Sequence, residues 1–67
     1  MTLNQQETEI VDVLGAYGPM TGVQLLHELR WNTAKLYPLL AGLKNKNVVA
    51  ERTATEYPFA TQYLLVG

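Results

Sequence analysis

The spacing of apolar residues predicts a first helix over residues 3–17. Its apolar positions recur at i, i+3, i+4 and i+7, which places them on one stripe of a helix: Ile10, Val13, Leu14 and Tyr17. Two residue pairs could cap its start: Thr2 with Gln5, or Asn4 with Glu7. Gly18 and Pro19 should end it, because glycine accepts a left-handed backbone and proline cannot continue the hydrogen-bond ladder.

The next apolar patterns predict two further helices joined by a tight connection. The shorter one begins at Thr21, where "TGVQ" is a capping box, and it ends near Leu29. Its expected buried face consists of Val23, Leu26 and Leu29. The longer one starts at Asn32 or Thr33 and ends near Lys46, and its expected core stripe consists of Leu36, Leu39, Leu40 and Leu43. Two helices joined by such a short turn form a helix-turn-helix.

After Asn47, which should adopt a left-handed conformation, the pattern changes to that of strands. Residues 48–53 and 59–66 predict two strands, and residues 54–58 predict the loop of a hairpin. A hairpin is marginal by itself, so we expect Tyr63 and Leu65 to pack it on the helices. The predicted fold is α+β, one domain over residues 1–67, in winged helix-turn-helix order with the hairpin as the wing.

The longer helix contains Pro38, which lies beyond the first turn and removes one ladder bond. We therefore expect a kink or a delayed regular start. The face opposite the leucine stripe carries small groups: Ala34, Pro38, Ala41 and Asn45. Small outward side chains let a helix approach the major groove closely. The same face would also suit packing against another protein.

Charge is distributed unevenly along a chain whose net charge is −1. Residues 1–29 carry four carboxylates and no lysine or arginine, whereas residues 30–52 carry all five basic residues together with Glu51. This separation predicts an electrostatic face, although five bases can also be ordinary surface charge.

Composition argues against several classes of function. The chain has no cysteine, no serine, one histidine and no glycine-rich phosphate loop, so we expect no enzyme, no metal site and no cofactor. Glu7, Glu9 and Asp12 are expected on a solvated helix face. No apolar run reaches the ~18 residues of a membrane span, and the N-terminus has no secretory pattern. We therefore expect a cytoplasmic protein without membrane contact.

Double-stranded DNA is the predicted partner. First-turn contacts are expected from Asn32, Thr33, Lys35 and Tyr37, phosphate contacts from Lys44, Lys46 and Arg52, and wing contacts from Thr53 and Thr55. Replacing Lys35 and Lys46 with alanine should flatten the salt dependence of binding.

Two other interactions remain open at this point. A protein-binding winged helix would use Ala34, Pro38 and Ala41 with exposed aromatic residues, for which the candidates are Trp31, Tyr37 and Tyr57. Trp31 is also a candidate lid of the core. A homodimer could form through the first helix or through the edge of the second strand, which is apolar on both faces.

The stretch "LYPLLAGLKNKNVVAER", residues 36–52, resembles the PadR-like transcriptional regulators. The Leu-Tyr-Pro-Leu-Leu run and Leu43 match the recognition helix of that family, and "MTGVQLLHEL" and "TQYLLVG" are similar to its second helix and second wing strand. The resemblance covers about residues 10–67, with Asn47 where the family usually has glycine. It implies a winged helix-turn-helix repressor, or a small phage- or plasmid-type operator binder. It covers the DNA-binding domain alone, without the C-terminal helices through which that family dimerises.

Overall fold

The first helix begins at a capping box. In the computed structural model, which describes residues 3–53 and 60–66, α1 (Gln5–Tyr17) is capped by Asn4, whose side chain accepts the Glu7 N–H at 2.7 Å. The Glu7 carboxylate in turn accepts the Asn4 N–H at 3.1 Å. The sequence allowed two capping pairs, and the structure has the one formed by Asn4 and Glu7. The helix ends at Gly18, where φ is 81°, as its glycine and proline predict.

The two following helices begin where the sequence places them. Thr21 and Gln24 form the predicted capping box of α2 (Gly22–Leu29), and Asn32 caps α3 (Thr33–Asn45). The α3 helix is regular from Thr33 and continues through Pro38, so the delayed start that the proline suggested is not observed. Pro38 cannot donate to the Ala34 carbonyl, and both residues lie on the exposed side of the helix.

The end of α3 depends on Asn47, which has the predicted left-handed conformation with φ at 60°. Its N–H donates to the Lys44 carbonyl, and the Val48 N–H donates to the Leu43 carbonyl, both at 3.0 Å. These two bonds form a Schellman motif, which turns the chain sharply from α3 into the first strand of the wing.

The hairpin is part of a three-stranded antiparallel sheet. It consists of β2 (Val49–Thr53) and β3 (Thr61–Leu65), and β1 (Met20–Thr21) pairs with the other side of β3. The predicted hairpin is confirmed, although residues 54–58 lie outside the described residues. The short strand β1 was not predicted, because two residues between Pro19 and a helix cap carry no periodic signal.

This sheet order corrects one expectation. The strand that seemed to offer an exposed apolar edge is β3, and β3 is the central strand, paired with both neighbours. Among the described residues the edge strands are the two-residue β1 and β2, and the longer of these edges, β2, carries Glu51, Arg52 and Thr53. The argument from an apolar edge therefore does not hold for β3, and a homodimer through the first helix or the open β2 edge of the wing stays a prediction.

The core lies between the three helices and one face of the sheet. Its buried apolar residues are Ile10, Leu14, Met20, Leu25, Leu36, Leu40, Leu43, Val49 and Tyr63. Tyr63 and Leu65 join the hairpin to this cluster, as predicted. Val23, expected in the core, is 62% exposed, whereas Leu25 is fully buried. The buried face of α2 follows positions 22, 25, 26 and 29, and its first member is a glycine that no hydrophobic pattern reveals.

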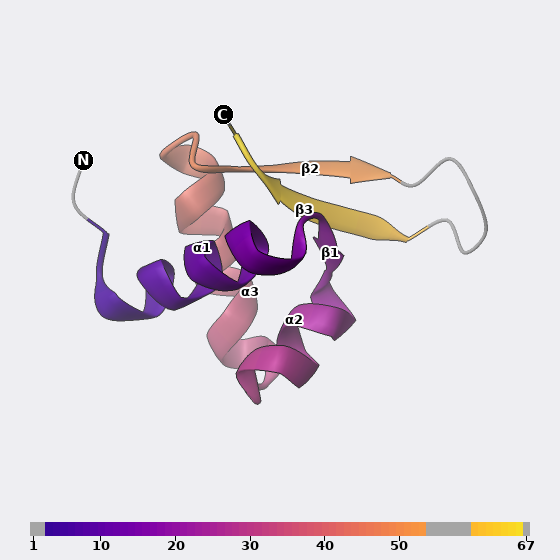
Figure 1. Cartoon of the computed structure of the whole chain (residues 1–67). Coiled ribbons are helices and arrows are strands. Elements are labelled where there is room, and N and C mark those ends of the chain that lie inside the picture. The colour runs from indigo at the N-terminus through magenta and orange to yellow at the C-terminus, as the bar shows by residue number, and fades with distance from the viewer. Residues whose placement is uncertain (1–2, 54–59, 67) are drawn as a thin grey trace.

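The described residues thus form an α+β domain of three helices and a three-stranded sheet (Figure 1), an arrangement compatible with a winged helix. The hairpin of β2 and β3 projects beyond the helices. Across residues 3–53 and 60–66, none of the helices has the length and apolarity that crossing a bilayer requires.

Candidate nucleic-acid interface

The outward face of α3 is exposed and consists of small groups. Ala34, Pro38, Ala41 and Asn45 all lie in solvent, on the side of the helix opposite the buried leucines. This confirms the orientation that the leucine stripe predicts. A helix with such a face can approach a flat or grooved partner closely, because no long side chain holds the two surfaces apart.

The first turn of α3 carries three of the predicted contact residues, all exposed: Asn32, Thr33 and Lys35. The Asn32 side-chain oxygen accepts the Lys35 N–H at 2.9 Å, so its amide nitrogen is the part left for an external partner. The Lys35 ammonium lies 4.3 Å from the centre of the Trp31 ring. Trp31 is partly buried and packs against the core, which fits its predicted role as a lid. The Lys35 ammonium therefore makes its cation–π contact with a ring that the core holds in position.

Tyr37 joins α3 to the start of α2. Its side chain is 41% exposed, and its hydroxyl lies so close to Gly22 that a Cβ atom at that position would be 2.4 Å from the oxygen. Glycine at position 22 therefore makes room for the tyrosine ring between the two helices of the helix-turn-helix. This contact gives Tyr37 a structural role in addition to any contact with a partner.

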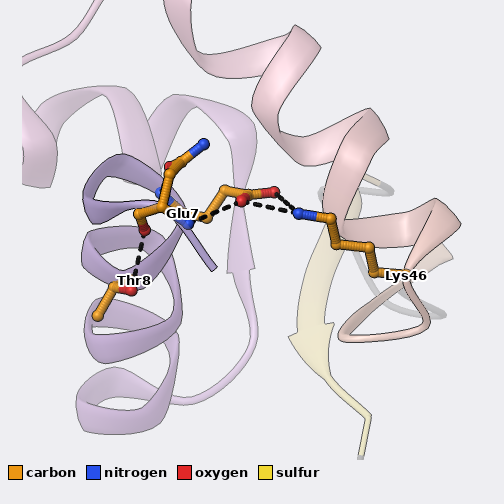
Figure 2. A network of polar contacts seen from close by, with 4 residues as sticks. Glu7, Thr8 and Lys46 are labelled. Atoms are coloured by element: carbon orange, nitrogen blue, oxygen red, sulfur yellow. Dashed lines mark hydrogen bonds and ion pairs between the residues drawn. The ribbon is translucent and has the colours of Figure 1, made fainter. Parts of the chain in front are cut away.

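Lys46 has a partner that the sequence does not indicate. Its ammonium contacts both oxygens of the Glu7 carboxylate at 2.9 Å (Figure 2), which ties the end of α3 to the start of α1. Glu7 is only 4% exposed, so the expectation that it lies on a solvated face is wrong. Hydrogen bonds from Lys46, and then from the Asn4 backbone, lower the pKa of Glu7 below its ordinary value.

Lys44 is also paired. Its ammonium lies 2.9 Å from the Glu51 carboxylate, and both side chains are more than a third exposed. The pair bridges α3 and β2 beside an open groove of about 270 Å³. The groove is lined by Tyr37, Leu40, Ala41, Lys44, Asn45, Glu51 and Tyr63. Burial raises the pKa of Tyr63 above its ordinary value, which already keeps the hydroxyl protonated at neutral pH.

The wing supplies the remaining predicted contacts. The Arg52 Nε donates to the Gln62 side-chain oxygen at 3.1 Å, and no carboxylate of residues 3–53 and 60–66 pairs with the guanidinium. Thr53 is exposed at the end of β2 and pairs with Thr61. Thr55 lies outside the described residues.

Three cations in the described part of the chain have no carboxylate partner there: Arg30, Lys35 and Arg52. Arg30 was not among the predicted contacts. It occupies the turn between α2 and α3 in a left-handed conformation with φ at 59°, and it is exposed. Its position in the connection of the helix-turn-helix could have identified it from the sequence as a candidate DNA contact.

Comparisons with protein-family models, with curated proteins and with solved structures found no match to this chain. The resemblance to PadR-like regulators therefore stays a prediction.

Proposed function

We propose that this protein is a transcriptional regulator of the repressor or operator-binding kind. In this proposal α3 enters the major groove of double-stranded DNA, and the β2–β3 wing lies on the adjacent backbone. The observation that carries the proposal is the exposed, small-residue face of α3, with Lys35 at its start and the Arg52 guanidinium on the neighbouring wing. Asn32, Thr33, Tyr37 and Thr53 complete the proposed contacts.

The ion pairs set how strongly the domain can bind. Lys46 is assigned to the fold, because releasing it would leave the buried Glu7 carboxylate without its cation. Lys44 is shared with Glu51. Each phosphate contact contributes about 0.9 to the log–log salt slope on duplex DNA, so contacts from Arg30, Lys35 and Arg52 give a slope of about −2.7. Binding by one domain should therefore be weak at physiological salt and tighter when two sites are adjacent.

The test is selection of binders from a random pool of DNA duplexes, followed by affinity measurements over a range of salt concentrations. We expect an enriched motif and a slope near −3 per domain. A motif with two-fold symmetry would indicate a dimer on DNA. Salt-independent binding, or no enrichment over the starting pool, would overturn the proposal.

A further inference from the structure

A core tyrosine reaches the surface in the groove between α3 and the wing. We call this groove the wing groove and define it by four of its lining residues: Tyr37, Lys44, Glu51 and Tyr63. Tyr63 is only 8% exposed and belongs to the core cluster. Of the tyrosines at positions 17, 37 and 63, only Tyr17 forms a hydrogen bond through its hydroxyl with a described residue. Since no described side-chain oxygen is both fully buried and unpaired, the Tyr63 hydroxyl must be accessible, and the wing groove is the place where it is reached.

Tyr63 shares this groove with an ion pair on the helix-facing side of the sheet. Glu51 lies directly opposite Tyr63 in the β2–β3 pair, so both side chains point to the same face. That face looks toward α3, because the Glu51 carboxylate contacts the Lys44 ammonium at 2.9 Å. Burial first, and then the nearby Glu51 and Tyr37, raise the pKa of Tyr63. The Tyr63 hydroxyl therefore lies among polar groups, at the boundary between the core and the groove.

The two tyrosines of the wing groove supply neutral hydrogen-bond donors. Lys44 and Glu51 neutralise each other, so the pair gives the groove no net charge. The hydroxyls of Tyr37 and Tyr63 are protonated at neutral pH, and no described residue accepts a hydrogen bond from them. Two such donors on one groove suit a ligand with several acceptor oxygens. A phosphate group has this chemistry, whereas a cation would find only a carboxylate that is already paired.

The wing groove continues the outward face of α3. Ala41 and Asn45 belong to that face and also line the groove. A partner that covers the outward face of α3 therefore also extends over the groove. In the DNA proposal this partner is a duplex, whose major groove is bordered by the phosphates of its two strands. A phosphate is thus the group that a bound duplex brings to Tyr37 and Tyr63.

We propose that the wing groove binds one DNA phosphate, whose oxygens accept hydrogen bonds from the Tyr63 and Tyr37 hydroxyls. This inference rests on the proposed function and adds Tyr63, a core residue by its sequence pattern, to the contacts. Lys44 stays with Glu51 in this arrangement. Because neither hydroxyl carries a charge, the contact displaces no counterion from DNA. It therefore adds affinity without steepening the salt slope.

The test measures binding of Y63F over a salt series, on a duplex selected by the unmodified chain. The substitution removes one hydroxyl and keeps the ring in the core, so the thermal midpoint should be unchanged. We expect an affinity about tenfold lower at every salt concentration with the same log–log slope, because a hydrogen bond to a charged group is lost and no cation is removed. Y17F is the matched control, since the Tyr17 hydroxyl donates to Glu28 away from the groove. It should bind DNA as the unmodified chain does.

A second measurement identifies the phosphate. In a series of duplexes, one phosphate at a time is replaced with an uncharged methylphosphonate. We expect a position at which the replacement weakens binding of the unmodified chain and has much less effect on Y63F. The inference fails if Y63F binds with unchanged affinity, if its salt slope becomes flatter, if Y17F loses as much affinity, or if no phosphate position is coupled to Tyr63. A chain that binds none of the duplexes would instead overturn the proposed function, and this inference with it.

Discussion

At the scale of single residues, two lysines that look equivalent in the sequence have different surroundings. Lys35 is exposed at the start of α3, whereas Lys46 is bound to a buried carboxylate. We expect K35A to reduce the salt slope of DNA binding by about 0.9 for one lost phosphate contact. K46A should leave the slope unchanged and lower the thermal midpoint. Binding over a salt series and thermal melts of both variants check this, and a flatter slope in K46A would return Lys46 to the interface.

Arg30 shows how a residue can be unfavourable for the fold and useful at the proposed interface. Its left-handed backbone is costly for a residue with a Cβ atom and free of strain for glycine. We expect R30G to raise the free energy of unfolding by roughly 0.5–1 kcal/mol while weakening DNA binding. Chemical denaturation and DNA titration of the same variant measure the two effects.

Asn47, also left-handed, serves as the control for this prediction. It is outside the proposed interface, and N47G should stabilise the fold without changing DNA affinity. A fully active R30G variant would show that Arg30 does not contact DNA.

At the scale of elements, the Lys44–Glu51 pair joins α3 to the wing. In the proposed complex, Lys44 is then not available to a DNA phosphate. The pair is solvent-exposed, so it contributes only about 0–1 kcal/mol to stability. We expect E51Q to leave the fold intact, to tighten DNA binding and to steepen the salt slope by about 0.9, because Lys44 becomes available to a phosphate. The double variant E51Q/K44A should return to the original slope. No change in E51Q would place Lys44 outside the interface.

The Glu7–Lys46 pair joins α1 to α3 and should make stability depend on pH. Since the pKa of Glu7 is lower in the folded state than in the unfolded chain, its contribution is complete above the ordinary carboxyl range. It is lost as the pH falls through the folded pKa. Thermal melts between neutral and acidic pH should show E7Q less stable than the original chain at neutral pH, with the difference shrinking in acid.

The exposed Glu9 gives the matched variant, since none of the described residues forms an ion pair or hydrogen bond with its side chain. E9Q should follow the original chain across the whole pH series. An E7Q variant whose melts also coincide with those of the original chain would exclude a stabilising role for the pair.

At the scale of the whole molecule, stability depends on a small core. A chain of 67 residues is expected to have a free energy of unfolding of about 3–10 kcal/mol. Leu36 is fully buried, and L36A should cost about 2–5 kcal/mol, a large part of that total. We expect chemical denaturation followed by circular dichroism to show a loss of this size for L36A, with a clearly lower midpoint than that of the original chain. Ala41 is exposed on the same helix, so A41G should lower the free energy of unfolding by only about 1 kcal/mol. Equal losses of stability in L36A and A41G would contradict the observed orientation of α3.

The sequence determined the local elements of this protein. Each helix start is encoded by a cap within three residues of its partner, as with Thr21 and Gln24. Gly18 and Asn47 encode the ends of α1 and α3, whereas the left-handed end of α2 falls on Arg30, which no local signal predicts. The leucines of α3 set which side faces outward, because their 3.6-residue period allows one buried stripe. These signals lie within a few residues of the feature they determine, so they can be read without knowing how the rest of the chain folds.

Tertiary structure alone decided what depends on partners distant in sequence. The two residues of β1 form a strand because β3 passes beside them, which also makes β3 the central strand. Glu7 and Lys46 are 39 positions apart, and their pairing gives Lys46, one of the predicted DNA contacts, a structural partner that the sequence does not indicate. Val23, expected in the core, is exposed, and Leu25 is fully buried, because the face of α2 that meets the core begins at Gly22, where Tyr37 packs. Charge and burial are properties of neighbours in space, and these neighbours are set only when the chain is folded.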